Sequence, residues 1–169
     1  MNVFEAIDSR RSIRDFTGEA ISEQNLKTIL KAGFQAPSAH NLEPREFIVV
    51  KDKKIIEEIV KFHKYAKMLP QAGYGIIVCG DTTKQDVLGF VISDCSASIQ
   101  NMLLAAHGLD LGAVWCGVYP REHLIKGMTD VLNLPEHIVP VGMVVVGVKD
   151  GGPAAIDRYD ESKIHYEGW

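Results

Sequence analysis

The sequence predicts one domain built on a single β-sheet, of either the α/β or the α+β class. The 169 residues are 46% hydrophobic and 24% charged, which is ordinary composition for a globular domain. Segments with the apolar spacing of helices alternate with short runs that have the pattern of strands. No linker, internal repeat or low-complexity stretch interrupts them, so we expect residues 1–169 to form one unit.

Four shorter helices are predicted from apolar periodicity and end signals. Asn2–Ser9 carries apolar residues on one side and could form two short turns. Ser22 is the expected N-cap of the next helix, which Pro37 ends, and Asp52 is the expected N-cap of a third. The last of the four is expected to begin at Pro120.

Four apolar runs are predicted to form the strands, namely Glu46–Lys51, Gly75–Cys79, Gly112–Val118 and Val141–Val148. The longest apolar run, around Val139 to Val148, is too short to cross a bilayer, so no membrane association is expected.

The stretch from Val87 to Gly117 is predicted to hold the helix around which the domain is built. Its apolar side chains recur at spacings of three and four: Leu88, Val91, Ile92, Cys95, Ile99, Met102, Leu103, Ala106 and Leu109. Gly108 is expected to end this helix in the left-handed conformation. Because Asp94 is the only formal charge between Gly89 and Gly108, no face is suited to water, and we expect a second subunit to cover the helix.

The final segment, Asp157–Trp169, is polar with spaced aromatic residues and cannot form a core of its own. One interpretation is a frayed tail. The other is an arm that lies on another surface, which we expect to be the second subunit. Apolar side chains such as Tyr159, Ile164, Tyr166 and Trp169 are costly to leave in water, and this favours the arm.

Composition and motifs narrow the functional classes. A formal charge of −4 offers no broad surface for nucleic acid, so small molecules are the expected partners. Cys79, Cys95 and Cys116 lie in apolar segments and no secretory signal precedes them, so we expect reduced thiols and a cytoplasmic location.

No dinucleotide fingerprint GxGxxG, phosphate loop GxxxxGK[ST] or nucleophile elbow GxSxG is present. The histidines and cysteines lack metal-ligand spacing, so no metal is expected. His63, His123 and His137 are interpreted as ordinary hydrogen-bonded core or surface residues.

Two polar segments are candidate site elements. Arg10-Arg11-Ser12-Ile13-Arg14 places three guanidinium groups within five residues. It is either a solvated charge patch or an anion site, since planar guanidinium forks suit phosphate oxygens. The stiff loop Ala36–Pro44 either lines a site or is a plain connector.

The RRSIR cluster, the APSAHNLEP loop before a strand, the central helix leading to GAVWCG, and the tail RYDESKIHYEGW together resemble the nitroreductase family of FMN-dependent oxidoreductases. The resemblance extends over nearly the whole chain, from about Arg10 to Trp169. It implies an α+β fold with a central, mostly antiparallel sheet flanked by helices. It also implies an intertwined homodimer in which the C-terminal arm, residues 150–169, docks on the partner and two FMN molecules lie in the interface.

The resemblance assigns roles to individual residues. Arg10, Arg11 and Ser12 would hold the phosphate end of FMN, and Arg158 would complete that clamp. Arg14 would reach the pyrimidine edge of the isoalloxazine ring and support the negative charge of the reduced flavin.

Other roles are implied for a loop and a strand end. Loop residues would cross over from the partner subunit: Pro37, Ser38 and Ala39. Asn41 would lie near the flavin ring, and Gly117, after Cys116, would offer a backbone N–H toward flavin N5. No side chain is assigned as a catalytic acid, base or nucleophile.

The chain differs from the family pattern at two places. Where the family loop usually reads N-x-Q-P-W, residues 41–45 read NLEPR, and the basic residue usual two places before Arg158 is Ile156. These differences bear on FMN affinity and on which substrate is accepted.

The resemblance favours an oxidoreductase that passes a hydride from NADH or NADPH, through flavin N5, to a nitroaromatic, quinone, enone or halogenated aromatic acceptor. Because the sequence has no separate nucleotide fold, donor and acceptor would use one pocket in turn, by ping-pong kinetics. Two alternatives remain open. One is a non-catalytic FMN-storage or redox-sensing module, and the other is a dimeric scaffold without a cofactor.

Overall fold

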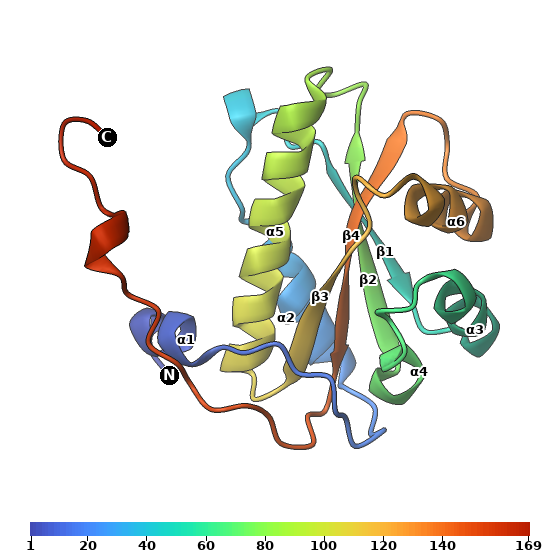
Figure 1. Ribbon diagram of the computed structural model, residues 1–169. Coiled ribbons are helices and arrows are strands. Elements are labelled where there is room, and N and C mark those ends of the chain that lie inside the picture. The colour runs from blue at the N-terminus through green and yellow to red at the C-terminus, as the bar shows by residue number, and fades with distance from the viewer.

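A four-stranded antiparallel sheet with the order β1-β2-β4-β3 forms the centre of the computed structural model, which describes residues 1–169 (Figure 1). The strands are β1 (Arg45–Val50), β2 (Tyr74–Asp81), β3 (Gly112–Gly117) and β4 (Ile138–Gly147). The four predicted strands are confirmed, and β2 and β4 are longer than predicted. Every neighbouring pair is antiparallel, so the fold is α+β and not α/β.

The predicted helices are also present. They are α1 (Val3–Ser9), α2 (Glu23–Phe34), α3 (Lys53–Phe62), α5 (Leu88–Gly108) and α6 (Glu122–Leu132), with one further short turn, α4 (Leu69–Ala72), and two 3₁₀ turns, Ala39–Asn41 and Glu161–Lys163. Both predicted N-caps are confirmed. The Ser22 hydroxyl accepts the Asn25 N–H at 3.1 Å, and the Asp52 carboxylate accepts the N–H groups of Lys54 and Ile55.

The end of α5 differs from the prediction. Gly108 is the last helical residue, and the left-handed residue is Asp110, with φ of 60°. The Leu111 N–H donates to the Ala106 carbonyl and the Asp110 N–H donates to the His107 carbonyl, which is the Schellman arrangement. An aspartate tolerates this conformation, so the helix includes the expected terminator Gly108, and the left-handed residue follows two positions later.

The start of α6 differs as well. Pro120 lies in a turn closed by the Arg121 N–H and the Val118 carbonyl at 3.0 Å, and Arg121 is the N-cap. Pro120 therefore precedes the helix and is not its first residue.

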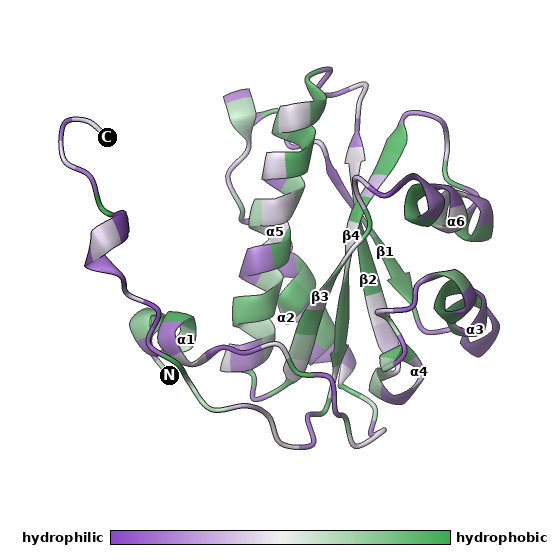
Figure 2. Ribbon diagram, in the orientation of Figure 1, coloured by the Kyte–Doolittle hydropathy of each residue, from purple (hydrophilic) through white to green (hydrophobic).

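Helices cover both faces of the sheet. Helices α2 and α5 pack on one face, and α3, α4 and α6 pack on the other (Figure 1). In Figure 2 the strands are mostly hydrophobic. The helices are hydrophobic on the sides that face the sheet and hydrophilic on the sides that face away from it. Each face has its own core cluster, and side chains alternate between them along β2, with Ile77 in one and Ile76 in the other.

The apolar stripe of α5 is confirmed as core over most of its length. The buried residues, which pack against the sheet and α2, are Val91, Cys95, Ile99, Met102, Leu103 and Ala106, whereas Ile92 and Leu109 are half-buried and Leu88 is exposed. By length and composition alone, α5 could also cross a membrane, but the core helix of a soluble protein passes the same test. Its opposite side, with Gly89, Ser93 and Gln100, is exposed in the single chain.

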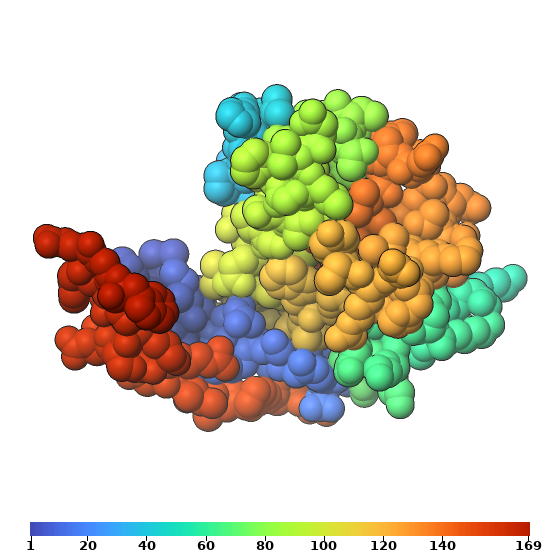
Figure 3. Space-filling model, turned by 45° about the horizontal axis from the view of Figure 1, so that its top comes forward, coloured from blue at the N-terminus to red at the C-terminus, as the bar shows by residue number.

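The segment from Asp150 to Trp169 leaves the body of the domain and runs past α1 (Figures 1 and 3). All of these residues are exposed, and Phe4 on α1 is 75% exposed. The surface area of 9924 Å² exceeds the roughly 8,300 Å² expected for a compact monomer of 18.7 kDa. The arm and α1 account for this excess because neither has a core to cover it within the single chain.

The core position of α5 generates a stability prediction. Ile99→Ala removes a fully buried side chain of the α2–α5 core, so the free energy of unfolding should fall by about 2 to 5 kcal/mol. Urea unfolding followed by circular dichroism measures it. Glu57→Ala, at an exposed position of α3, is the control and should change the value by less than about 0.5 kcal/mol. Equal losses in the two variants would contradict the assigned packing.

Candidate functional site

The predicted arginine stretch runs along the open edge of β3. The Ile13 N–H donates to the Ala113 carbonyl at 3.0 Å, and the Ile13 side chain is buried. This bond holds residues 10–14 beside the strand, so the two ends of the stretch lie at different places. Arg10, at the end of α1, faces the tail, and Arg14 faces the carboxyl end of β3.

Three guanidinium groups gather at the first of these places, and we call Arg10, Arg11 and Arg158 the arginine cluster. Burial lowers the pKa of Arg10, and the positive charges of Arg11 and Arg158 lower it further, so tail and N-terminal stretch are close. Ser12 is half-buried next to them in the chain. No member forms an ion pair with a carboxylate. The cluster therefore has the donor set of an anion site.

Arg11 also fixes the start of the tail. Its guanidinium donates to the Ala154 carbonyl at 3.2 Å and to the Ile156 carbonyl at 3.0 Å. Position 156, which lacks the basic side chain usual in the family, therefore contributes its backbone to the cluster.

The carboxyl end of β3 presents free backbone groups. Backbone groups of an edge strand point alternately toward its neighbour and away from it. Because the Ala113 carbonyl faces Ile13, the backbone N–H and C=O groups of Trp115 and Gly117 also face the open edge. The Gly117 carbonyl accepts a hydrogen bond from His63 at 3.1 Å, whereas its N–H has no protein acceptor.

A hollow of about 610 Å³ opens at this edge, and we call it the β3 pocket. Its lining residues are Arg14, Lys64, Tyr65, Lys67, Met68, Val114, Trp115, Cys116, Gly117, Tyr119, Pro120 and Arg121. Four of them are cationic and none is acidic. The structure thus brings the predicted residues Arg14, Cys116 and Gly117 together, and adds cations that sequence reasoning missed.

Two of the missed cations, Lys64 and Lys67, come from the segment between α3 and α4, and the third, Arg121, is the N-cap of α6. In the sequence this segment reads HKYAK, and its basic character was the only available signal. It reaches β3 because the Cys116 thiol donates to the Tyr65 carbonyl at 3.4 Å and His63 donates to the Gly117 carbonyl.

Cys116 is a buried residue of the pocket wall, and His63 lies beneath that wall and does not line the pocket. Burial raises the pKa of the Cys116 thiol to about 11, and the nearby Arg14 offsets only part of this rise, so the thiol stays protonated. Burial also lowers the pKa of His63, which is fully buried, although the hydrogen bond to Gly117 opposes the shift. The Cys116 thiol is protonated and the neutral His63 imidazole has no exposed surface, so neither group can attack a substrate, and His63 is a core residue as predicted.

The predicted loop, with Pro37, Ser38, Ala39 and Asn41, lies at the opposite end of α5. The Ala39 N–H donates to the Asp94 carboxylate at 3.0 Å, whereas the Ser9 hydroxyl near the arginine cluster bonds His107 at 2.7 Å. Asp94 and His107 are about 20 Å apart along α5, because an α-helix rises about 1.5 Å per residue. Within one chain, the loop does not join the arginine cluster.

The residues that replace the usual amide and indole of the loop interact with each other. Arg45 is 4% exposed, and it pairs with Glu43 at 3.2 Å and donates to the Phe34 carbonyl at 2.6 Å. Arg45 therefore anchors the loop to α2 and faces no pocket.

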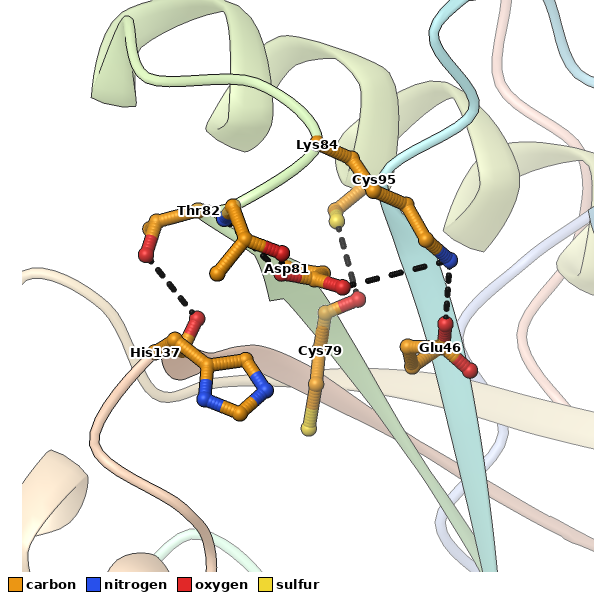
Figure 4. Close-up of polar contacts among 8 residues, drawn as sticks. Glu46, Cys79, Asp81, Thr82, Lys84, Cys95 and His137 are labelled. Atoms are coloured by element: carbon orange, nitrogen blue, oxygen red, sulfur yellow. Dashed lines mark hydrogen bonds and ion pairs between the residues drawn. The ribbon is translucent and has the colours of Figure 1, made fainter.

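A second polar group lies at the end of β2 near the start of α5 (Figure 4). Lys84 bridges Glu46 at 2.7 Å and Asp81 at 4.0 Å, and the Cys95 thiol donates to the Cys79 carbonyl at 3.3 Å. Burial raises the pKa of both thiols to about 12. All three cysteines are free and buried, so this group is structural.

Comparison with known proteins gives one family over most of the chain. The sequence model of the nitroreductase family matches residues 7–73 and 63–148. A relative from Methanothermobacter thermautotrophicus, provisionally named an NADH dehydrogenase/NAD(P)H nitroreductase, is 41% identical over all of this chain and 88% of its own length.

Solved structures give the same result. A crystal structure of a protein with the same provisional name from Parabacteroides distasonis superposes with a TM-score of 0.94 at 36% identity and covers 98% of both chains. A provisional nitroreductase from Desulfovibrio desulfuricans, solved in complex with FMN, gives a TM-score of 0.87 at 29% identity, covering 100% of this chain and 98% of that one.

The buried imidazole beneath the pocket generates a pH prediction. Because folding lowers the pKa of His63 below its ordinary 6.5, the unfolded chain binds a proton there that the folded chain does not. The free energy of unfolding should therefore fall as pH decreases from about 7 to about 5.5.

Urea titrations at several pH values measure this slope. His63→Gln should have a smaller slope, and His137→Gln, at an exposed position, should keep the wild-type slope. A slope that is unchanged in His63→Gln would show that the buried imidazole is not its source.

Proposed function

The chain belongs to the nitroreductase family, and from this premise we propose that it transfers reducing equivalents from NAD(P)H, through FMN, to a small electron-poor acceptor. Its relatives are NAD(P)H-dependent flavin oxidoreductases, and this chain is an enzyme of that kind. The observation that carries the proposal is a set of cations without carboxylate partners at both ends of residues 10–14, the arginine cluster at one end and the β3 pocket at the other.

This donor set fits FMN. Four extended residues span at most about 14 Å, so one molecule with a phosphate at one end and a polar ring at the other can contact both places. The guanidinium groups of the arginine cluster, which have no carboxylate partner, suit a single terminal phosphate. The absence of an adenosine-binding fingerprint favours FMN over FAD.

Each residue then has a defined task. Arg10, Arg11 and Ser12 hold the phosphate end, together with Arg158. The side chain of Arg14 places a fixed positive charge beside the ring, where it stabilises the negative charge of the reduced cofactor. Bound FMN supplies the redox chemistry, since its N5 takes up a hydride equivalent from NAD(P)H and returns it to the acceptor.

A backbone N–H group completes the site, which contains no side-chain nucleophile. The free N–H of Gly117 points to the open edge, where it can donate to N5. No thiolate or imidazole nucleophile lines the β3 pocket, so the protein contributes orientation and charge rather than covalent chemistry. Donor and acceptor use this one pocket in turn, which gives ping-pong kinetics. Nitroaromatic, quinone, enone and halogenated aromatic acceptors all fit such a site.

We also propose that the working unit is a homodimer. The loop with Pro37, Ser38, Ala39 and Asn41 is held at Asp94 and the arginine cluster lies near His107, two positions about 20 Å apart along α5, so a two-fold partner is needed to bring loop and cluster together. The uncovered side of α5 and the arm 150–169 provide the surface for it, and the arm docks on the partner. Free buried thiols favour the cytoplasm as its location.

The rival proposal is a passive FMN-binding module, which the arginine cluster fits equally well. The β3 pocket favours the enzyme, because it leaves about 610 Å³ of open, cation-lined space beside Gly117.

An absorbance spectrum tests the function. The purified protein should carry flavin bands, release FMN on denaturation, and lose its colour when NADPH or NADH is added without oxygen. A bound flavin that neither donor bleaches would support the passive module, and absence of flavin after reconstitution would contradict both.

Arg14→Ala should slow this bleaching by the equivalent of about 1.5 to 3 kcal/mol while FMN is retained. Arg10→Ala, as the matched variant, should weaken FMN binding instead and leave the rate per bound flavin near wild type.

A dimer prediction follows from the uncovered side of α5. Ala97→Glu places a charge on this side, so it should disrupt assembly and release FMN together, because binding and assembly are linked. Deleting residues 159–169 should weaken both in the same sense. Sedimentation velocity with flavin occupancy measured on each species provides the readout. A wild-type monomer with a full complement of FMN would be incompatible with a shared site.

A further inference from the structure

The β3 pocket does not end at the strand. A second hollow of about 320 Å³ adjoins it and shares three of its wall residues, Lys64, Tyr65 and Arg121. It continues toward His123 at the start of α6. We call Lys64, Tyr65, Arg121 and His123 the rim, since they border the route from the β3 pocket to solvent.

The rim carries positive charge and no negative charge. Lys64 and Arg121 carry positive charge, no aspartate or glutamate lines either hollow, and neither cation forms an ion pair. Lys67 and Arg14 stand in the adjoining part of the β3 pocket. In a chain with a formal charge of −4, four unpaired cations around one hollow make it a local region of positive potential.

An aromatic ring lies between these charges. The Lys64 ammonium is 5.1 Å and the Arg121 guanidinium 5.3 Å from the centre of the Tyr65 ring, which is 53% exposed. The ring therefore helps to hold both cations in place while one part of it remains open to a ligand.

The rim is fixed to the reacting end of the site. The Tyr65 carbonyl accepts from Cys116, and the Ala66 N–H donates to the His63 carbonyl at 2.8 Å, while the His63 side chain bonds Gly117. These bonds connect the rim segment directly to the two residues at the end of β3. A group bound at the rim therefore keeps a fixed position relative to Gly117.

FMN does not account for these charges. It carries one phosphate, which the proposed function assigns to the arginine cluster, and its ring is assigned to Arg14, so Lys64 and Arg121 have no assigned partner. We propose that the rim, with Lys64 and Arg121 as its cations, binds an anionic group of the substrate and holds the substrate's conjugated ring in the β3 pocket. This inference rests on the proposed function. The anion is either a phosphate of the dinucleotide donor or a carboxylate on the acceptor.

Kinetics of the FMN-loaded enzyme test the rim. Arg121→Gln and Lys64→Gln each remove one rim charge, and Lys126→Gln removes the same charge from an exposed position of α6 outside both hollows. The donor arm compares NADPH with NADH, and the acceptor arm compares 4-nitrobenzoate with the neutral 4-nitrobenzamide. Each rim variant should raise KM for the anionic substrate about three- to tenfold, with a smaller change in kcat and a weaker dependence on salt.

Each outcome has a defined meaning. A higher KM for the donors assigns the rim to dinucleotide phosphates, and a larger effect for NADPH locates the 2′-phosphate there. A higher KM for nitrobenzoate but not nitrobenzamide assigns the rim to the acceptor. KM values equal to those of Lys126→Gln in both arms would overturn the proposal, as would loss of FMN with unchanged kinetics per bound flavin. In either of the last two cases, wild-type bleaching by NAD(P)H would leave the proposed function standing.

Discussion

One backbone hydrogen bond, from the Ile13 N–H to the Ala113 carbonyl, organises the candidate site. It places an extended, arginine-rich segment against the only free edge of β3. The same bond establishes which backbone groups of β3 remain open, because donors and acceptors alternate along an edge strand. Without it, Arg10 and Arg14 would have no fixed relation to Gly117, and the two ends of the site could not serve one ligand.

The second constraint is the length of α5. The helix is buried along one side by the sheet and α2, and its two ends carry different parts of the predicted site. Asp94 holds the loop near one end, and His107 contacts Ser9 near the other. A rigid helix cannot bring these parts together, so a site that uses both must be shared between two chains. This geometry and the exposed arm lead to the same proposed dimer.

Charge is distributed unevenly in the molecule. Arg45 is the only arginine that forms an ion pair, and it does so away from both hollows. The other arginines face the arginine cluster or the β3 pocket without a carboxylate, and mutual repulsion within the cluster lowers the pKa of Arg10 in addition to the effect of burial. Such an arrangement costs stability in the free protein and is offset when an anion binds, since binding to the folded state alone stabilises it.

The sequence by itself determined the local structure. Caps such as Ser22 and Asp52, the three-and-four spacing of α5, and the four apolar strand runs act over a few residues and could be read directly. The family motifs added Arg14 and Gly117 as site residues, which the structure places in one pocket.

Only the tertiary structure decided what depends on contacts between distant residues. The left-handed residue after α5 is Asp110 rather than Gly108, since hydrogen bonds across the last turn determine where the helix ends. All strand pairs are antiparallel, which periodicity could not distinguish. The basic segment HKYAK became part of the site because Cys116 and Gly117 bond to Tyr65 and His63, residues about 50 positions away in the chain. Such pairings follow from how helices and strands pack, because side-chain chemistry specifies what a residue can bind, whereas packing specifies which residues meet.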